Sequence, residues 1–360
     1  MKKILCVYGT RPEIIKMVSV IEALKGRPDV ECRVLNTGQH RGMVEALERM
    51  FGLEPDYRFD IMRGNQSINQ IVAAVVAEFG GLLREYRPDV VVVQGDTSTV
   101  FSVAVAAFNE GIEVAHVEAG LRSFDIRSPF PEEFNRRAVS LVATYNFPPT
   151  ERAAENLKNE GVPDSMIWVT GNTVIDAIRL IEGRGELDDV NGADGRNILV
   201  TAHRRESFGD GIRNICQAVR QVAEHYADVR FVWPVHPNPN VSDVVRAELS
   251  GVDRVELCEP LDYLALLSAM RSSYMIWSDS GGIQEESPTF AKPILILRDV
   301  TERPEVVESG HGLLVGTDVG KIVIEAERLL TDGSIYAKRT EGANPFGDGC
   351  AGRKIAEVLA

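Results

Sequence analysis

The chain has little that would mark it as a secreted or membrane-bound protein. Its cysteines are scattered, odd in number and free of any CxxC spacing: Cys6, Cys32, Cys216, Cys258 and Cys350. This pattern favours reduced thiols over a disulfide framework or a zinc site. No stretch approaches the roughly 18 apolar residues that a membrane span requires. The opening apolar run is too short for a signal peptide. We therefore expect a cytoplasmic protein with no metal site and no membrane partner.

Positive charge is also scarce, with 39 Lys and Arg against 53 Asp and Glu and a net charge of −14. No long basic run offsets this acidity, which argues against a nucleic-acid partner. Low-complexity tracts and fixed-period repeats are missing too, so a solenoid is not expected. A phosphorylated substrate remains compatible, because local Arg and Lys can outweigh a distant acidic surface. The 360 residues are enough for two domains.

Short apolar runs alternate with amphipathic helical patterns along the whole chain. Val- and Ile-rich strands separated by helices predict an α/β protein with parallel sheets covered on both faces. The series restarts after a polar stretch, so we expect two Rossmann-like domains, 1–170 and 171–345, facing across a cleft. A terminal helix at 346–360 is expected to cross back to the first domain. The expected strands are 4–8, 32–36, 90–94, 113–117, 198–201, 230–234, 255–257, 274–277 and 294–297.

The most informative stretch is 276–286, with the sequence IWSDSGGIQEE. A buried strand ends, a small-residue turn follows and a helix opens at Gly281. The first amides of a helix lack intrahelical partners and carry partial positive charge, and Gly281 and Gly282 leave room for an anion. We expect Ser280 and both glycines to bind a phosphate or diphosphate, and Glu286 to accept hydrogen bonds from sugar hydroxyls. The alternative is a helix capped by Ser280, with glycines that serve packing.

Polar side chains gather just after the first expected strand. Thr10 and Glu13 have the spacing of a capping box, and Pro12 suits the first turn of a helix. Neither feature explains Arg11 and Lys16, which are suited to bind phosphate or carboxylate. Ordinary solvated charges are the alternative interpretation of both residues.

Carboxylates follow two later strands. Asp96 comes after strand 90–94 and is also suited to cap the next helix. Glu118 comes after strand 113–117, where an ionised group is costly unless it is paired or functional. An ion pair with Arg122 is the structural alternative for Glu118.

A further helix is expected to start near Glu132. Glu132 and Arg136 lie one turn apart on one face, and Glu133 and Arg137 on the neighbouring face. Exposed pairs of this kind contribute only a few tenths of a kcal/mol. The second interpretation is that one pair faces a cleft and the other faces solvent.

The second half of the chain places cations after its strands. His203, followed by two arginines, comes after strand 198–201 and is suited to meet a diphosphate. His236, in a proline-rich loop after the next strand, is either a further ligand contact or structural. Arg303 lies one strand beyond the glycine turn and is placed to reach the same ligand.

Together these motifs closely resemble the non-hydrolysing UDP-N-acetylglucosamine 2-epimerases of the GT-B superfamily. Each motif is modest alone, but their shared order is specific. The resemblance implies a GT-B fold and reversible conversion of UDP-N-acetylglucosamine to UDP-N-acetylmannosamine for cell-surface polysaccharide biosynthesis. The matching motifs are 9–13 (GTRPE), 94–97 (QGDT), 116–122 (HVEAGLR), 131–133 (PEE), 201–206 (TAHRRE), 278–286 (SDSGGIQEE) and 298–305 (RDVTERPE).

The resemblance also implies a mechanism. UDP is eliminated across C1–C2 to give 2-acetamidoglucal, and it adds back with a proton delivered to the opposite face of C2. Two proton-handling groups are needed for this, on different sides of the ring. No metal, nicotinamide or flavin is implied. Asp96, Glu118 and Glu132 match the catalytic carboxylates, without indicating which is the base, and Arg136 matches a residue near them.

By the same resemblance, several groups stabilise or hold the nucleotide. His203, Arg11 and the amides of 280–282 are expected to stabilise the departing UDP. Glu286 is expected to hold the ribose, and Lys16 and Arg303 to line the nucleotide side. A homodimer is implied as well.

The chain departs from the family pattern at two places. Leu261 and Leu266 stand where many relatives have Gln and Phe beside the uracil. Bacterial members are activated by a second UDP-N-acetylglucosamine, and Gly42 and Asn65 stand where longer polar side chains are expected for this. These departures argue against activation here. The residues that do resemble the activator site are Gln39, His40, Arg41, Arg204 and His236.

Three other functions share parts of this pattern. The same chemistry on a modified sugar, such as UDP-2,3-diacetamido-2,3-dideoxyglucuronate, has all the motifs and is poorly separated from the first function. A GT-B glycosyltransferase or a catalytically silent nucleotide-sugar sensor would not need three acids near C2. The acids therefore disfavour both.

Overall fold

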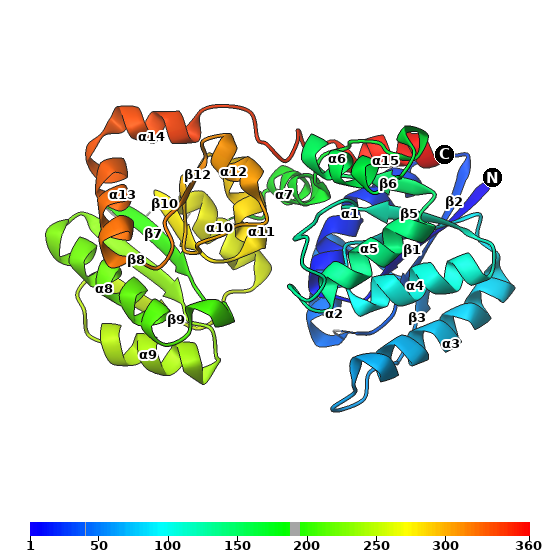
Figure 1. Ribbon diagram of the computed structural model, residues 1–360, viewed down its shortest axis with the longest axis horizontal. Coiled ribbons are helices and arrows are strands. Elements are labelled where there is room, and N and C mark those ends of the chain that lie inside the picture. The colour runs from blue at the N-terminus through cyan, green and yellow to red at the C-terminus, as the bar shows by residue number, and fades with distance from the viewer. Residues whose placement is uncertain (40, 188–194) are drawn as a thin grey trace. The chain divides into compact units, whose positions relative to one another are not determined.

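The computed structural model describes residues 1–39, 41–187 and 195–360 (Figure 1). It contains two compact units, one formed by Met1–Leu180 with Phe346–Ala360 and the other by Ile181–Pro345. Each unit holds one sheet of six described strands, all parallel and accompanied by helices. The expected α/β class is confirmed. In the described ranges, no helix combines the length and apolar character needed to cross a bilayer.

The first sheet has the strand order β3-β2-β1-β4-β5-β6. Its direction of growth reverses between β1 and β4, so the loops that follow these two strands leave the sheet side by side. The strands are β1 (Lys2–Tyr8), β2 (Val30–Asn36), β3 (Tyr57–Arg58), β4 (Val90–Gln94), β5 (Glu113–Val117) and β6 (Tyr145–Phe147). The helices are α1 (Arg11–Lys25), α2 (Arg41–Phe51), α3 (Ile68–Tyr86), α4 (Ser98–Asn109), α5 (Glu132–Val142), α6 (Glu151–Asn159), a 3-10 turn (Asp164–Met166), α7 (Thr173–Gly183), which extends into the second unit, and α15 (Ala351–Leu359).

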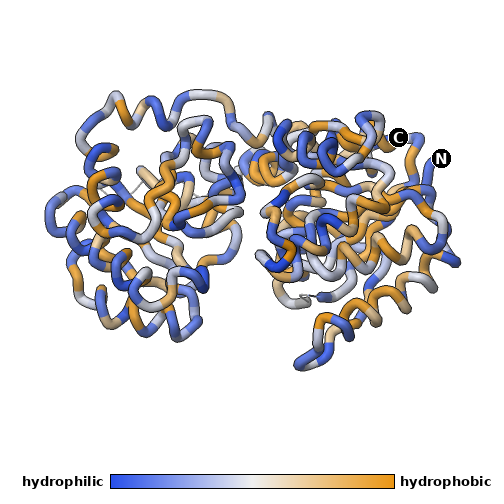
Figure 2. The backbone as a smooth tube through the Cα atoms, in the orientation of Figure 1, coloured by the Kyte–Doolittle hydropathy of each residue, from blue (hydrophilic) through white to orange (hydrophobic). Residues whose placement is uncertain are grey.

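The core of the first unit lies on both faces of this sheet. Apolar side chains of β1 and β4 pack with α3, α4 and α5 in one buried cluster. Hydrophobic stretches of the trace accordingly run along α3 and α4, which cover this sheet (Figure 2). Helix α15 packs against α1, and a Cβ built at Gly352 would lie 2.7 Å from the backbone of Ser19. The last helix of the chain is therefore part of the first unit.

The second sheet has the order β12-β11-β10-β7-β8-β9, and its direction reverses between β10 and β7. Its core contains the fully buried Phe231, Trp233 and Trp277. The strands are β7 (Arg196–Thr201), β8 (Val229–Pro234), β9 (Val255–Cys258), β10 (Met275–Ser278), β11 (Ile294–Ile296) and β12 (Gly312–Leu314). The helices are α8 (Asp210–His225), α9 (Pro239–Leu249), α10 (Tyr263–Ser272), α11 (Gly281–Glu286), α12 (Pro304–Glu308), α13 (Val319–Thr331) and α14 (Gly333–Thr340), with 3-10 turns at Arg205–Ser207 and Ser287–Phe290.

The expected strands are all present, and three further strands were missed. Strands β3, β6 and β12 have only two, three and three residues. Runs this short are too brief to show a hydrophobic period. They are edge strands, and their pairing with the neighbouring strand defines them.

Candidate active site

Asp96 lies in the turn between β4 and α4. Its carboxylate accepts a hydrogen bond from Arg136 Nη2 at 2.6 Å. The helix cap is supplied by Thr97, whose hydroxyl accepts from the amide of Val100 at 3.2 Å. The interpretation of Asp96 as a cap is therefore wrong, because the next residue takes that place and leaves the Asp96 side chain for Arg136.

The backbone of the Asp96 turn is bound by a buried histidine. His116 on β5 lies 2.7 Å, through Nε2, from the carbonyl oxygen of Gly95. A carbonyl can only accept, so Nε2 must carry the proton. Burial lowers the pKa of His116 to about 4. The imidazole is therefore neutral near pH 7 and acts as a fixed donor.

Side chains of α5 and α1 also bind the Asp96 turn. Asn135 on α5 donates to the carbonyl of Asp96 at 2.9 Å. Glu13 on α1 accepts from the hydroxyl of Thr97 at 2.6 Å, and its other oxygen accepts from the amides of Gly9 and Thr10 at 2.6 and 3.2 Å. The expected helix-start role of Glu13 is confirmed, and burial raises its pKa. Side chains of α1, β5 and α5 thus hold the Asp96 turn together.

Glu118 occupies the position just after β5. Its φ of 64° lies in the left-handed region that non-glycine residues seldom adopt. Its carboxylate pairs with Lys16 of α1 and accepts from Gln94 Nε2 at 2.8 Å. Arg122 binds Glu160 instead, at 2.6 Å. The interpretations of Lys16 as a solvated charge and of Arg122 as the partner of Glu118 are both wrong.

The first turn of α5 carries the remaining candidates. The expected i,i+4 pairs do not form, because the arginines take other partners. Arg136 pairs with Asp96 and, at 3.4 Å, with Glu133 on the same helix, and Arg137 lies 3.4 Å from Glu160. Glu132 is half-buried, and no hydrogen bond or ion pair is found for it in the described ranges. One acid of the predicted set is thus unpaired and two are held by cations.

The structure brings most first-unit candidates to one edge of the sheet. Asp96 and Arg136 are in contact, Glu118 and Lys16 are in contact, and Gln94 joins the Glu118 pair to the strand that precedes Asp96. Arg11 begins α1 after β1. The prediction missed several supporting residues that lie in or near the recognised motifs: Glu13, Gln94, His116, Glu133 and Asn135. The signal for them was their place at a strand end, for Gln94 and His116, or in the first turn of a helix, for Glu13, Glu133 and Asn135.

In the second unit, the turn between β10 and α11 is built as an open cradle. A Cβ at Gly281 would lie 3.8 Å from the guanidinium groups of both Arg204 and Arg303, an ordinary contact distance. At Gly282 the nearest atom, the Ser280 hydroxyl oxygen, is 3.9 Å away. Packing therefore does not require glycine at either position. Ser280 makes no side-chain cap, so the purely structural interpretation of this turn is wrong.

Two side chains near this turn, Arg303 and Glu286, are held by buried neighbouring residues. Arg303 donates through Nε to the buried Glu285 at 2.6 Å. Glu286 is also buried and lies 3.3 Å from the hydroxyl of Tyr263, which donates to it. Leu261 and Leu266, the two departures from the family pattern described above, are half-buried.

His203 follows β7 and stacks on His236, with ring centroids 5.3 Å apart and planes at 14°. The carboxylate of Asp279 accepts from the amides of His203 and Arg204, each at 2.7 Å. Its other oxygen lies 3.5 Å from His203 Nδ1. Burial lowers the pKa of His203, against the opposing effect of Asp279. Asp279 was not among the predicted site residues.

The residues that resemble an activator site are described only in part. The Gln39 side chain accepts from the hydroxyl of Thr99. Asn65 has a φ of 58° in the loop before α3. His40 and the side chain of Arg41 lie outside the described residues.

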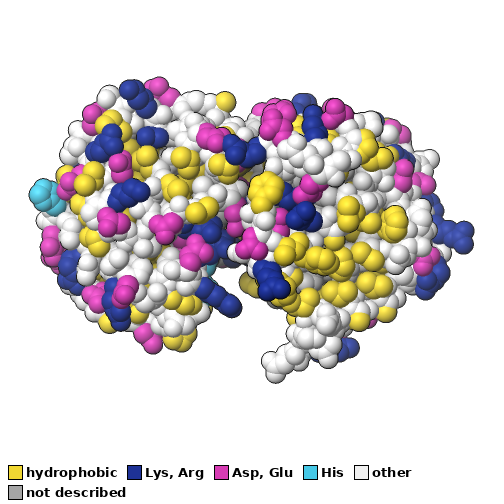
Figure 3. Space-filling view, viewed as in Figure 1, with side chains coloured by type: hydrophobic (Ala, Val, Ile, Leu, Met, Phe, Trp, Pro, Cys, Tyr) yellow, Lys and Arg dark blue, Asp and Glu magenta, His cyan; other side chains and the backbone are white. Residues whose placement is uncertain are grey.

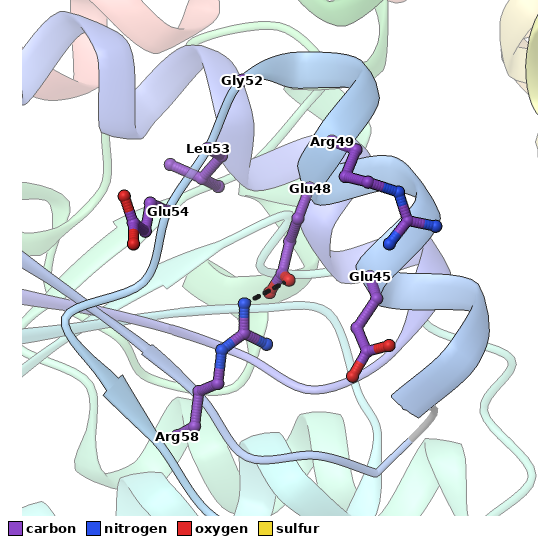
Figure 4. Close-up of a pocket in the computed structure, with 7 residues that line it drawn as sticks. All are labelled: Glu45, Glu48, Arg49, Gly52, Leu53, Glu54 and Arg58. Carbon is purple, nitrogen blue, oxygen red and sulfur yellow. Dashed lines mark hydrogen bonds and ion pairs between the residues drawn. The ribbon is translucent and has the colours of Figure 1, made fainter.

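A cavity of about 440 Å³ lies elsewhere on the first unit, beside α2 and β3 (Figure 4). Glu48 at its wall is 4% exposed and accepts from Tyr8, Asn36 and Arg58 at 2.8, 2.8 and 2.6 Å. None of the candidate site residues lines it. The lining residues are Glu45, Glu48, Arg49, Gly52, Leu53, Glu54 and Arg58.

Comparison with known proteins relates this geometry to a family. A family model described as UDP-N-acetylglucosamine 2-epimerase matches residues 22–360. A UDP-N-acetylglucosamine 2-epimerase of Yersinia pestis is 46% identical, over 99% of this chain and 98% of the relative. The enzyme of the same name from Escherichia coli K12 is 44% identical over the same shares of both chains.

Solved structures agree with this relationship. The UDP-GlcNAc 2-epimerase of Neisseria meningitidis bound to UDP-GlcNAc has a TM-score of 0.91 at 40% identity and covers 99% of both chains. The enzyme of Methanocaldococcus jannaschii in complex with UDP-GlcNAc and UDP has a TM-score of 0.83 at 33% identity, over 100% of this chain and 99% of that one. MurG of Acinetobacter baumannii, at 15% identity and a TM-score of 0.61, shares the fold alone. The chain therefore belongs to the UDP-N-acetylglucosamine 2-epimerase family of enzymes.

Proposed function

We propose that this enzyme interconverts UDP-N-acetylglucosamine and UDP-N-acetylmannosamine by inverting the configuration at C2. The observation that carries the proposal is family membership along nearly the whole chain, with the acids Asp96 and Glu118 held in ion pairs at one sheet edge. The Neisseria meningitidis relative binds UDP-GlcNAc. A UDP-sugar is therefore the substrate class of this proposal.

The reaction we propose is an elimination followed by an addition. A base removes the C2 proton, the C1–O bond breaks with its electron pair going to UDP, and 2-acetamidoglucal remains bound. UDP then adds back to C1 while C2 receives a proton on the opposite face. This sequence needs proton-handling groups on both faces of the ring. Asp96, Glu118 and Glu132 are the residues proposed for it.

The ion pairs give these acids fixed positions. Arg136 holds the Asp96 carboxylate and Lys16 holds that of Glu118, while the turn and strand behind them are bonded to the core. Groups placed before substrate arrives need no reorganisation in the transition state. Lys16 is thus proposed to act by positioning Glu118, in addition to its expected place near the nucleotide.

The departing diphosphate needs positive groups, because its charge grows as the C1–O bond breaks. We propose that the amides of Ser280, Gly281 and Gly282 and the guanidinium of Arg303 receive it, with His203 and Arg11. Glu286 takes the ribose hydroxyls and His236 supports His203. The open space at Gly281 beside two guanidinium groups supports this assignment.

The test is direct. Purified protein is incubated with UDP-N-acetylglucosamine, and the sugar anomeric signals are followed by proton NMR. The proposal predicts a mixture that contains UDP-N-acetylmannosamine and is reached from either sugar. Turnover of only a diacetamido-uronate nucleotide would contradict this substrate, and release of free sugar or its transfer to an acceptor would contradict the reaction.

We also propose that the enzyme is a homodimer joined through the outer faces of α3, α4 and α5. Helix α4 has no charged side chain, and most of it is buried within the unit, but its Phe108 is exposed. Contiguous exposed apolar side chains often mark a protein–protein interface. Apolar side chains gather over these helices (Figure 3). The exposed ones include Ile68 at 39%, Phe108 at 58%, Phe134 at 47% and Leu141 at 85%.

A second copy of the chain fits this face by its size. By helix rise, α3 with its 19 residues is about 28 Å long, and three packed helices span roughly 25–30 Å. The product, roughly 700–850 Å², matches the roughly 800 Å² that each partner contributes to a standard interface. An apolar face of this area suits a two-fold dimer, in which the same face of each copy meets the other.

A further inference from the structure

The two ring nitrogens of His203, Nδ1 and Nε2, have different surroundings. Its Nδ1 lies 3.5 Å from Asp279 Oδ1, and Asp279 is completely buried. That oxygen has no hydrogen-bond partner in the part of the chain that the structure describes. A buried carboxylate oxygen without a donor is costly, so Nδ1–H is its natural partner.

The other ring nitrogen of His203 is open. No partner of Nε2 is found among the described residues, and the side chain is 38% exposed. Asp279 is followed directly by Ser280 and Gly281, where the diphosphate is proposed to bind. A phosphate oxygen at this turn is a second acceptor. Neutral imidazole has one N–H and imidazolium has two, so only imidazolium satisfies both acceptors.

The groups that face His203 keep it neutral before the ligand arrives. Burial, His236 stacked on the ring after β8, and the neighbouring Arg204 all lower its pKa, and only Asp279, at the end of β10, raises it. The guanidinium of Arg303 also lies near Gly281, but its charge is paired with Glu285 and Glu302. A bound diphosphate adds negative charge beside His203, and this charge raises the pKa of the ring.

We infer that Asp279 is a positioning residue that holds the Nδ1 proton of His203, and that binding of the UDP-sugar diphosphate places a second proton on this ring. The proton comes from solvent, and no covalent bond forms or breaks elsewhere. The imidazolium then carries a full positive charge when the C1–O bond breaks. This charge stabilises the leaving diphosphate. This inference rests on the proposed function.

Two measurable consequences follow. Proton uptake makes binding of UDP-N-acetylglucosamine weaken with rising pH, by up to tenfold in Kd per pH unit, between the pKa of free His203 and the higher pKa of bound His203. The sugar nucleotide is a suitable probe, because its diphosphate diester does not itself titrate near neutral pH. Asp279→Asn presents an amide N–H to Nδ1, which must then accept, so the variant loses the uptake.

The experiment uses full-length protein labelled with 15N in its six histidines, with His203 assigned from the His203→Asn spectrum. At pH 7.5, saturation with UDP-N-acetylglucosamine is expected to change His203 from one protonated nitrogen to two. His225 and His311, which lie elsewhere in the same unit, serve as internal controls and stay unchanged. The Asp279→Asn variant is expected to remain neutral when saturated.

A His203 ring that stays neutral in the saturated wild type would overturn the inference and leave the proposed function standing. Full protonation in Asp279→Asn would overturn the role of Asp279. Absence of binding would defeat the proposed function and the inference with it. The wild-type measurement decides the matter even where the variant does not fold.

Discussion

At the scale of single residues, the acids of the first unit take their positions from distant partners. Asp96 is held by a residue 40 positions away and Glu118 by one 102 positions away. The sequence places both acids correctly after β4 and β5, since a strand end is a local feature. It cannot show their partners, because these ion pairs exist only once the sheet has brought α1, β4 and α5 together.

Asp96→Asn, Glu118→Gln and Glu132→Gln are expected to lower kcat by at least about 100-fold each, the usual range for a lost acid–base group. Binding of UDP is expected to change little, because none of the three acids is among the groups proposed to hold UDP. Turnover by NMR and UDP affinity by calorimetry measure the two effects. Glu357→Gln, an exposed acid on α15, is the control. Wild-type rates in all three variants would remove the catalytic assignment.

His116 is expected to make the enzyme sensitive to acid. Its pKa is about 4 when folded, against an ordinary 6.5, so the unfolded chain takes the proton first as pH falls. The stability linked to this residue is complete above pH 6.5 and is lost between 6.5 and 4. At pH 5 the loss is about 2 kcal/mol.

Urea unfolding at pH 7.5 and pH 5 measures this loss. Wild type is expected to lose about 2 kcal/mol more than His116→Asn between the two pH values, by the same linkage. An equal loss in both proteins would show that His116 is already charged when folded.

At the scale of elements, the hydrophobic pattern is a good guide to strands and a poor one to charge pairs. Nine strands were predicted and found, because buried parallel strands read as continuous Val- and Ile-rich runs. The ion pairs expected along α5 do not form, because spacing along a helix does not determine which partner a side chain takes. A spacing of four residues permits an ion pair, but a buried arginine such as Arg136 takes the stronger tertiary partner.

The close approach of α15 to α1 makes a prediction at this scale. Gly352→Ala would place a methyl group 2.7 Å from the backbone of Ser19, closer than atoms can pack. We expect a loss of about 1–3 kcal/mol, the usual effect of overpacking, measured by urea unfolding. Gly333→Ala, at a helical glycine with no neighbour within 4 Å, is the matched control. Equal stability of both variants would contradict the tight packing of these helices.

At the scale of the whole molecule, the family could be recognised from the sequence because its motifs are local and ordered. The face proposed for the dimer could not be recognised from the sequence. It combines residues from three helices, and its apolar residues have the same pattern as those that face a buried core. Leu141 at 85% exposure and Phe108 at 58% look like ordinary helix residues in the sequence.

Leu141→Glu combined with Phe108→Glu is expected to turn the dimer into a monomer, since two charges per copy would be buried in an apolar contact. Light scattering after size-exclusion chromatography measures the mass. Glu substitutions at Val300 and Ile324, which are exposed on the second unit, are the control. A double variant that remains dimeric would place the interface on another face.

The central claim, inversion at C2 through loss and return of its proton, is tested most directly in heavy water. UDP-N-acetylglucosamine is incubated with the enzyme in deuterium oxide, and the C2 position of each sugar is read by NMR. The account predicts UDP-N-acetylmannosamine carrying deuterium at C2. Epimerised product that keeps its original hydrogen at C2 would contradict it.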